Sequence, residues 1–214
     1  MTTEQLRHRM PPILKALKER SLRGRTPVEG LRRTECAYHG WDTVHADAAS
    51  WEPFAPGDAF GGLEAHHCFK GTVTLPEASA GKRVVCLVST GASDIWNNNN
   101  PQFLAYVDGR LVCGLDVNHN EFDLAACAVP GESHELALYV YCNTPARDVF
   151  LRVETAERDD DVTGLYYDLR APYEVCALLA DDDTRAIGIM KHLNRALNLL
   201  DLRDLDSGAF AQSV

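Results

Sequence analysis

The sequence predicts a mainly β protein: a β-sandwich or jelly roll with a helix before it and helices after it. From Trp51 to Glu157, short apolar and β-branched runs are separated by Gly, Pro, Asn and Asp, the usual turn residues of all-β domains. On either side of this stretch, apolar residues recur at helical spacing. We therefore expect a helical arm and linker over 1–50, a sandwich over 51–157 and a helical linker over 158–214.

The first helix is predicted by apolar residues that recur within a basic stretch: Leu6, Met10, Ile13, Leu14 and Leu17. Pro11 and Pro12 interrupt this pattern, and proline opens a helix more readily than it occupies the interior of one. We therefore expect a short amphipathic helix from Pro11 or Pro12 to about Arg20, docked on the domain.

Seven strands are predicted within the sandwich. They are Cys68–Leu75, Arg83–Ser89, Phe103–Val107, Arg110–Leu115, Glu121–Ala126, His134–Cys142 and Val149–Glu154. The strongest local signal is Asp108-Gly109 between two of these runs, because this pair readily adopts the positive φ values of a tight hairpin turn.

The C-terminal part is predicted to be helical, with each helix following three aspartates. Asp159–Asp161 and Asp181–Asp183 are more typical of helix caps than of a metal site. The first helix places Leu165, Leu169, Tyr173 and Cys176 on one face, with a kink at Pro172, and the second has a stripe of Ile187, Met190, Leu193, Leu197 and Leu200. This stripe needs a cover, so we expect a homodimer through these helices, with folding back onto the sandwich as the alternative.

The composition excludes several classes of function. The 214 residues contain no apolar run near the ~20 residues that a membrane-spanning helix needs. A formal charge of -10 argues against nucleic acid as a partner, since an acidic surface repels phosphates. The N-terminus lacks the apolar segment of a signal peptide, so we expect a cytoplasmic protein.

The seven widely spaced cysteines suggest reduced core thiols, and their spacing does not fit a zinc site.

No self-contained active site is evident in the sequence. Glu132 and Glu135 flank His134, but in a strand their spacing turns the two carboxylates to opposite faces. His66 and His67 likewise alternate across a strand, which favours hydrogen-bonded histidines over a shared metal. The motifs of nucleophilic hydrolases, P-loops and zinc peptidases do not occur.

Two polar segments are candidates for contact with carbohydrate. Trp96, Asn97 and Asn98 begin an Asn-rich segment that combines an aromatic ring with amide donors and acceptors. Asp116, Asn118 and His119 form a second polar cluster. For each segment, a plain turn is an equally good interpretation, because Asn and Asp are favoured turn residues.

The order of several motifs resembles the N-terminal β-domain of glycoside hydrolase family 38 α-mannosidases of the cytoplasmic or vacuolar type. These motifs are Trp51-x-x-Phe54-x-x-Gly57-Asp58-x-Phe60-Gly61, His67-x-Phe69-Lys70-Gly71, Leu75-Pro76, Gly81-Lys82, Val107-Asp108-Gly109-x-x-x-x-Gly114-Leu115-Asp116-x-Asn118-His119, Gly131-x-x-His134-Glu135-Leu136 and Leu165-Tyr166-Tyr167-Asp168-Leu169. The resemblance extends from about Trp51 to Leu200. It implies a galactose-binding-like jelly roll that serves as the accessory domain of an enzyme hydrolysing terminal α-mannosides.

The resemblance also implies that catalysis resides elsewhere. In the family, a catalytic domain follows these helices and begins with His-x-Asp-x-x-Trp, whose histidine and aspartate help to hold zinc. The chain ends at Val214 before such a segment, and His45-Ala46-Asp47 precedes the sandwich and lacks the tryptophan. No catalytic residue is carried over. We expect an N-terminal piece that is inactive alone and has no cofactor of its own. Its partners would be its own zinc-dependent (or other divalent-metal-dependent) catalytic domain and mannosides.

Two other classes of function remain as alternatives. One is a stand-alone carbohydrate-binding module that uses the Trp96 segment. The other is a structural domain that mediates oligomer formation.

Overall fold

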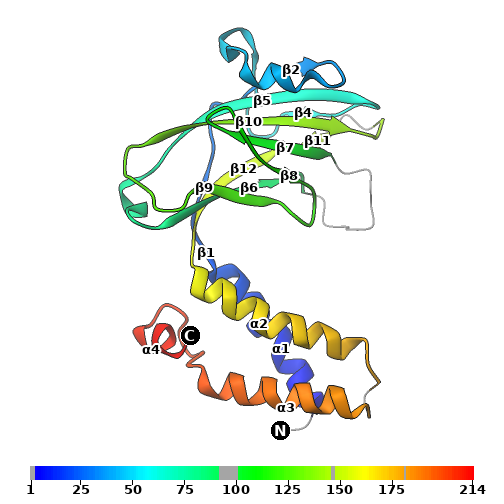
Figure 1. Ribbon diagram of the computed structural model, residues 1–214, viewed down its shortest axis with the longest axis vertical. Coiled ribbons are helices and arrows are strands. Elements are labelled where there is room, and N and C mark those ends of the chain that lie inside the picture. Colours follow the sequence, from blue (N-terminus) through cyan, green and yellow to red (C-terminus); the bar gives the residue numbers. More distant parts are fainter. Residues whose placement is uncertain (1–2, 92–100, 146–147, 181) are drawn as a thin grey trace. The chain divides into compact units, whose positions relative to one another are not determined.

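The chain forms two compact units, a sandwich unit and a helical unit. The computed structural model describes residues 3–91, 101–145, 148–180 and 182–214 (Figure 1). The sandwich unit spans Gly24–Glu157, and the helical unit combines Met1–Arg23 with Arg158–Val214. The sandwich unit thus begins well before the boundary expected at residue 51, because residues 1–50 contain two strands in addition to the helix.

Two antiparallel sheets form the layers of the sandwich unit (Figure 1). The six-stranded sheet has the order β3 (Glu52–Pro53), β2 (Arg32–Cys36), β5 (Ala65–Thr74), β10 (Ser133–Cys142), β7 (Gln102–Val107) and β8 (Arg110–Leu115). The four-stranded sheet has the order β1 (Leu22–Pro27), β12 (Arg152–Arg158), β6 (Arg83–Ser89) and β9 (Glu121–Ala125). A short pair joins β4 (Ala59–Phe60) to β11 (Val149–Phe150). The predicted mainly β fold, a sandwich with helices before and after it, is confirmed.

The main core lies between the two sheets. Alternate residues of β10, namely Leu136, Leu138 and Val140, are buried against residues such as Cys86 and Val88 of β6. The predicted Asp108-Gly109 turn is confirmed, since both residues have positive φ and Val107 pairs with Arg110. Five of the seven predicted strands match observed strands to within a residue or so, and β5 begins three residues earlier than expected.

Two further differences concern the strands. The predicted strand Val149–Glu154 is interrupted at Leu151, and its halves are β11 and the beginning of β12. Strands β1 and β2 were not predicted, because their residues are largely polar and show little apolar alternation. In β2, Arg32 donates to the carbonyls of Ala49 and Trp51. This charged side chain thus attaches the strand to the segment that contains these two residues.

The outer face of the six-stranded sheet is partly covered by the segment 38–51, which contains the 3-10 helices η1 (Gly40–His45) and η2 (Ala48–Ser50). Val44 and Trp51 of this segment pack on Cys68, Tyr106 and Ala137 of the sheet. A third 3-10 helix, η3 (Glu77–Ser79), follows β5. Segment 38–51 thus covers the central part of the outer face, and the rest of that face is not covered by it.

The helical unit packs α1 (Thr3–Arg20), α2 (Asp160–Ala177) and α3 (Thr184–Leu199) around one core, with α4 (Gly208–Ser213) contributing Phe210 (Figure 1). The prediction that α1 begins at Pro11 or Pro12 is wrong, since both prolines lie inside it. Pro11 has no N–H for the carbonyl of Arg7, and the Tyr173 hydroxyl of α2 donates to that carbonyl instead at 3.2 Å. Leu6, Met10 and Leu17, on both sides of the prolines, are buried.

The predicted caps and helix faces are confirmed. The Asp159 carboxylate accepts from the backbone N–H of Val162, and that of Asp183 accepts from Arg185. Leu169 and Cys176 of α2 are buried, and Leu165 and Tyr173 are partly buried with them. Within the described ranges, no helix combines the length and hydropathy that a bilayer-spanning segment needs.

The stripe on α3 is covered within the chain. Met190, Leu193 and Leu197 are buried against α1 and α2, Leu200 is partly buried, and only Ile187 is largely exposed, at 46%. The premise that the stripe lacks a cover is therefore wrong, because the other helices of its own unit supply one. The homodimer remains a prediction, but the exposed apolar stripe from which it was argued is not present in the structure.

Candidate functional site

A groove lies on the outer face of the six-stranded sheet, over β7, β8 and β10. Its volume is about 370 Å³, and its lining includes Gln102, Leu104, Asp116, His119, Tyr139 and Tyr141. Tyr139 and Tyr141 occupy the outer positions of β10, because the intervening residues point into the core. We call this hollow the outer-face groove.

Aromatic rings gather around this groove. The His66 ring of β5 stacks on Tyr139 (centroid separation 5.7 Å) and on Tyr141 (5.1 Å), and its Nδ1 lies 2.8 Å from the Tyr139 hydroxyl. Trp41 meets Tyr139 edge to face at 6.4 Å, and Tyr38 lies 5.5 Å from His66. Tyr38 is 71% exposed and Trp41 42%. These five residues form what we call the aromatic platform.

The second predicted carbohydrate segment lies at one side of the groove. Asp116 Oδ1 accepts from the backbone N–H groups of Asn118 and His119, both at 2.7 Å. These bonds, the one from His119 first, hold the pKa of Asp116 below its usual value. The segment therefore is an Asx-type turn, as the plain interpretation had it, and it also brings Asp116 and His119 into the groove. Asn118 is exposed and is not among the lining residues.

The first predicted segment cannot be compared, because Trp96, Asn97 and Asn98 lie outside the described residues. The aromatic platform was not predicted from the sequence either. A signal for part of it was present in His134–Cys142, where Tyr139 and Tyr141 alternate with the apolar residues that fill the core. No comparable signal indicated Tyr38 and Trp41, which reach the sheet through the fold of segment 38–51.

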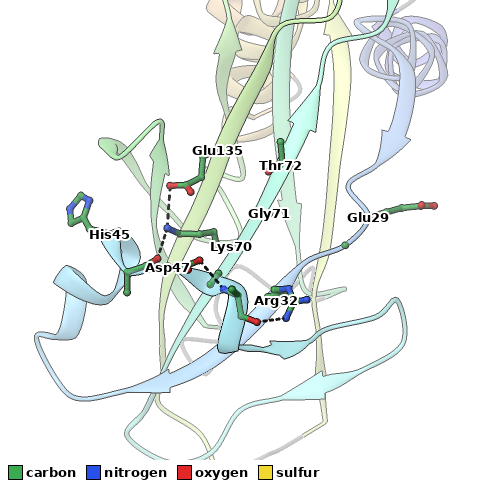
Figure 2. Close-up of a pocket in the computed structure, with 12 residues that line it drawn as sticks. Glu29, Arg32, His45, Asp47, Lys70, Gly71, Thr72 and Glu135 are labelled. Atoms are coloured by element: carbon green, nitrogen blue, oxygen red, sulfur yellow. Dashed lines mark hydrogen bonds and ion pairs between the residues drawn. The ribbon is translucent and has the colours of Figure 1, made fainter.

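A second hollow, of about 710 Å³, surrounds Lys70 on the same face (Figure 2). The Lys70 ammonium is buried, donates to the carbonyl of Ala46 at 2.8 Å and lies 3.2 Å from the Glu135 carboxylate. It also lies 5.9 Å from the centre of the Trp51 ring. Asp47 caps η2 by accepting from Ala49. These bonds hold segment 38–51 on the sheet, so this hollow has a structural role.

Replacing Lys70 with methionine should weaken the sandwich by about 1.5–3 kcal/mol, because a charged donor to Ala46 is lost while most of the apolar stem is kept. Hydrogen exchange in residues 40–50 should become faster. The matched control is Lys82→Met, which removes an exposed pair with Glu157 and should cost less than about 1 kcal/mol. Equal effects of the two substitutions would contradict this role.

The histidines and acids set aside in the sequence analysis are engaged in structural contacts. His134 Nδ1 lies 2.8 Å from Asp108 Oδ2, and Asp108 Oδ1 accepts from the backbone N–H of Glu135, which ties the hairpin turn to β10. The bond to His134, more than any other contact, holds the pKa of Asp108 below its usual value. Glu132 is 4.0 Å from His134, and Glu135 points toward Lys70. The two glutamates therefore do not converge, as predicted.

His67 faces the core, on the side of β5 opposite His66, as the strand pattern predicted. Its Nε2 lies 3.3 Å from the Gly61 carbonyl, and its buried Nδ1 has no hydrogen-bond partner among the residues that the structure describes. Burial is the main cause that lowers the pKa of His67. The Gly61 carbonyl and Glu35 oppose that shift, and Arg33 and His66 add to it. Protonation would therefore bury a second N–H without an acceptor.

The stability of the sandwich should consequently rise with pH up to about 6.5, the value at which an unfolded histidine releases its proton. Below that pH the unfolded chain binds a proton that native His67 does not, and this favours unfolding. Guanidinium unfolding followed by tryptophan fluorescence at pH 5.5–7.5 measures the slope. His67→Asn should flatten it, and an unchanged slope would assign the proton to another group.

A pair of thiols lies beneath segment 38–51. Cys36 and Cys68 have sulfur atoms 3.5 Å apart, and a hydrogen bond from Cys68 lowers the pKa of Cys36. All seven cysteines are free, but Cys127 is exposed, so the prediction of core thiols does not hold for it. Among the described residues, no group of three or more His, Cys, Asp or Glu is arranged to hold a metal ion.

Comparisons with known proteins found similarity only among solved structures. No protein-family model and no curated protein matches the sequence. A β-glucuronidase of an uncultured Clostridium species has 8% identity and a TM-score of 0.45, over 64% of this chain and 29% of that one. The Faecalibacterium prausnitzii β-glucuronidase has 13% identity and a TM-score of 0.42, over 64% and 32%. The Bacteroides uniformis β-glucuronidase has 11% identity and a TM-score of 0.44, over 62% and 18%.

The matched region thus covers less than a third of each of these three enzymes. Similarity of this extent assigns neither an activity nor a substrate to the present chain.

Proposed function

We propose that this chain is the N-terminal accessory region of a cytoplasmic α-mannosidase of glycoside hydrolase family 38, in which it scaffolds a catalytic domain. In this proposal, the zinc ion and the catalytic carboxylates belong to that domain, and no residue of this chain is assigned a catalytic role.

The proposal is supported by one observation: residues of the motifs that resemble the family 38 mannosidases pack in the core or close turns. Phe54, Phe60 and Phe69 form one edge-to-face cluster in the core. The Asp58 carboxylate accepts from the N–H of Ala55 at 2.7 Å and so closes a turn. A Cβ atom added at Gly71 would lie 2.8 Å from the Leu31 side chain, so this buried side chain would have to shift. These motif residues therefore serve core packing and turn formation, which supports a scaffold role for the chain.

Two measurements test this proposal. The purified chain should show no turnover of an aryl α-mannoside, with or without added zinc or cobalt, and metal-stimulated turnover that copurifies with the 23.6 kDa species would overturn it. An antibody against the chain should detect a native cytoplasmic protein longer by several hundred residues, the length that a catalytic domain requires.

The outer-face groove favours a second candidate, a stand-alone carbohydrate-binding module. The antibody experiment separates the two, because a native protein of 23.6 kDa would support the module and exclude the accessory region. With the α3 stripe buried, no contact among the described residues favours an oligomerisation domain.

A further inference from the structure

The outer-face groove has the chemical character of a small-ligand site. Its volume of about 370 Å³ falls in the range of such sites, roughly 300–1,000 Å³. Its lining combines apolar surface from Leu104 and the tyrosine rings with polar groups from Gln102, Asp116 and His119. Aromatic rings that present apolar surface beside hydrogen-bonding groups suit a ligand with C–H faces and hydroxyl edges.

The polar groups around the groove are held in place before any ligand arrives. The Tyr141 hydroxyl donates to Glu64 at 3.0 Å, and this bond raises the pKa of Tyr141. Asp116 is fixed by two backbone N–H groups, and His119 Nδ1 lies 3.4 Å from its carboxylate. Side chains that are already ordered lose little entropy on binding.

The charge of the groove narrows the class of ligand. Among the described residues, its lining contains Asp116 but neither lysine nor arginine, and Glu64 lies beside it, bonded to Tyr141. Phosphorylated or carboxylated ligands would meet the Asp116 carboxylate with neither a lysine nor an arginine of this lining to offset it. A carboxylate is, however, a strong acceptor for hydroxyl groups. The ligand class that fits is neutral and rich in hydroxyls.

We infer that the outer-face groove, together with the aromatic platform, binds a neutral oligosaccharide. The sugar rings lie against the partly exposed ring of Tyr141, and their hydroxyls bond to Asp116, His119 and Gln102. Because the groove is open and a bound sugar would keep much of its hydration, binding is weak, with a dissociation constant of about 1 mM.

The test titrates the full chain with mannotriose, maltotriose and cellotriose, following amide shifts by NMR and heat by calorimetry. At least one sugar should bind saturably with shifts in β7, β8 and β10. Tyr141→Ala should weaken that binding at least about tenfold and Asp116→Asn several-fold, whereas Tyr141→Phe, which keeps the ring, should change it less than about threefold. Tyr167→Ala, at an exposed tyrosine of the helical unit, is the matched control and should change nothing.

Asp116→Asn keeps the test valid if Tyr141→Ala does not fold, since asparagine can form the same turn. Absence of saturable binding by all three sugars would overturn the inference, and so would binding that Asp116→Asn and the Tyr141 variant leave unchanged. Trp96→Ala tests the sequence-based site in parallel, and its result does not alter these criteria. The inference does not depend on the native length of the protein, so its failure is distinct from failure of the proposed function.

Discussion

Replacing Leu197 with aspartate should unfold the helical unit at room temperature. Leu197 is 1% exposed in the core that α1, α2 and α3 share. The substitution removes apolar contacts worth about 2–5 kcal/mol and places a carboxylate in a cluster of buried apolar side chains. Because a whole domain is stable by only about 5–15 kcal/mol, this single change removes most of that margin.

Far-UV circular dichroism should show a large loss of helix, and hydrogen exchange should lose protection in residues 160–199. Leu199→Asp is the matched control: it makes the same chemical change two residues away at a position that is 80% exposed, and it should cost less than about 0.5 kcal/mol. Loss of a dimer without loss of helix in Leu197→Asp would restore the expected pairing of α3 between chains.

The elements that could be predicted from the sequence are those in which a local pattern determines the structure. The hairpin at Asp108-Gly109 was predictable because the turn requires two positive φ values, and α3 because its apolar period is regular. Helix α1 was shortened in the prediction because its prolines are tolerated through Tyr173, a residue far along the chain. No local pattern reports a contact of that kind.

The candidate site was predictable only in part, for a related reason. Asp116 and His119 were recognised from their polar cluster, but the groove also needs Tyr139 from β10, and segment 38–51 covers the adjoining part of the sheet. Segment 38–51 is held in place by Lys70 and Arg32. In a sequence, a charged residue usually predicts a solvent-exposed position, but here both side chains donate to backbone carbonyls of that segment. Sheet order, which brings β8 beside β7 and β7 beside β10, is likewise absent from any local pattern.

The second large effect is expected at Phe69 in the sandwich core. Phe69 is 0% exposed, and its ring meets Phe54 at 4.9 Å and Phe60 at 5.1 Å, both edge to face. It pairs with Leu138 across β5 and β10, the two longest strands of the six-stranded sheet. Phe69→Ala should destabilise the sandwich by about 3–5 kcal/mol, because it leaves a cavity beside the rings of Phe54 and Phe60. Strand β5 is paired on both sides, so it cannot move inward to fill that cavity.

Tryptophan fluorescence in guanidinium measures this loss selectively, since Trp41, Trp51 and Trp96 all belong to the sandwich unit. Phe150→Ala is the matched control: it deletes the same ring at a position that is 55% exposed and should cost less than about 1 kcal/mol. The groove residue Tyr139 is one position from Leu138 on β10, so a loosened core under Phe69 should also weaken any sugar binding. A loss below about 1.5 kcal/mol for Phe69→Ala would mean that the sheets close over the deleted ring, and the aromatic cluster would then not be the main support of this fold.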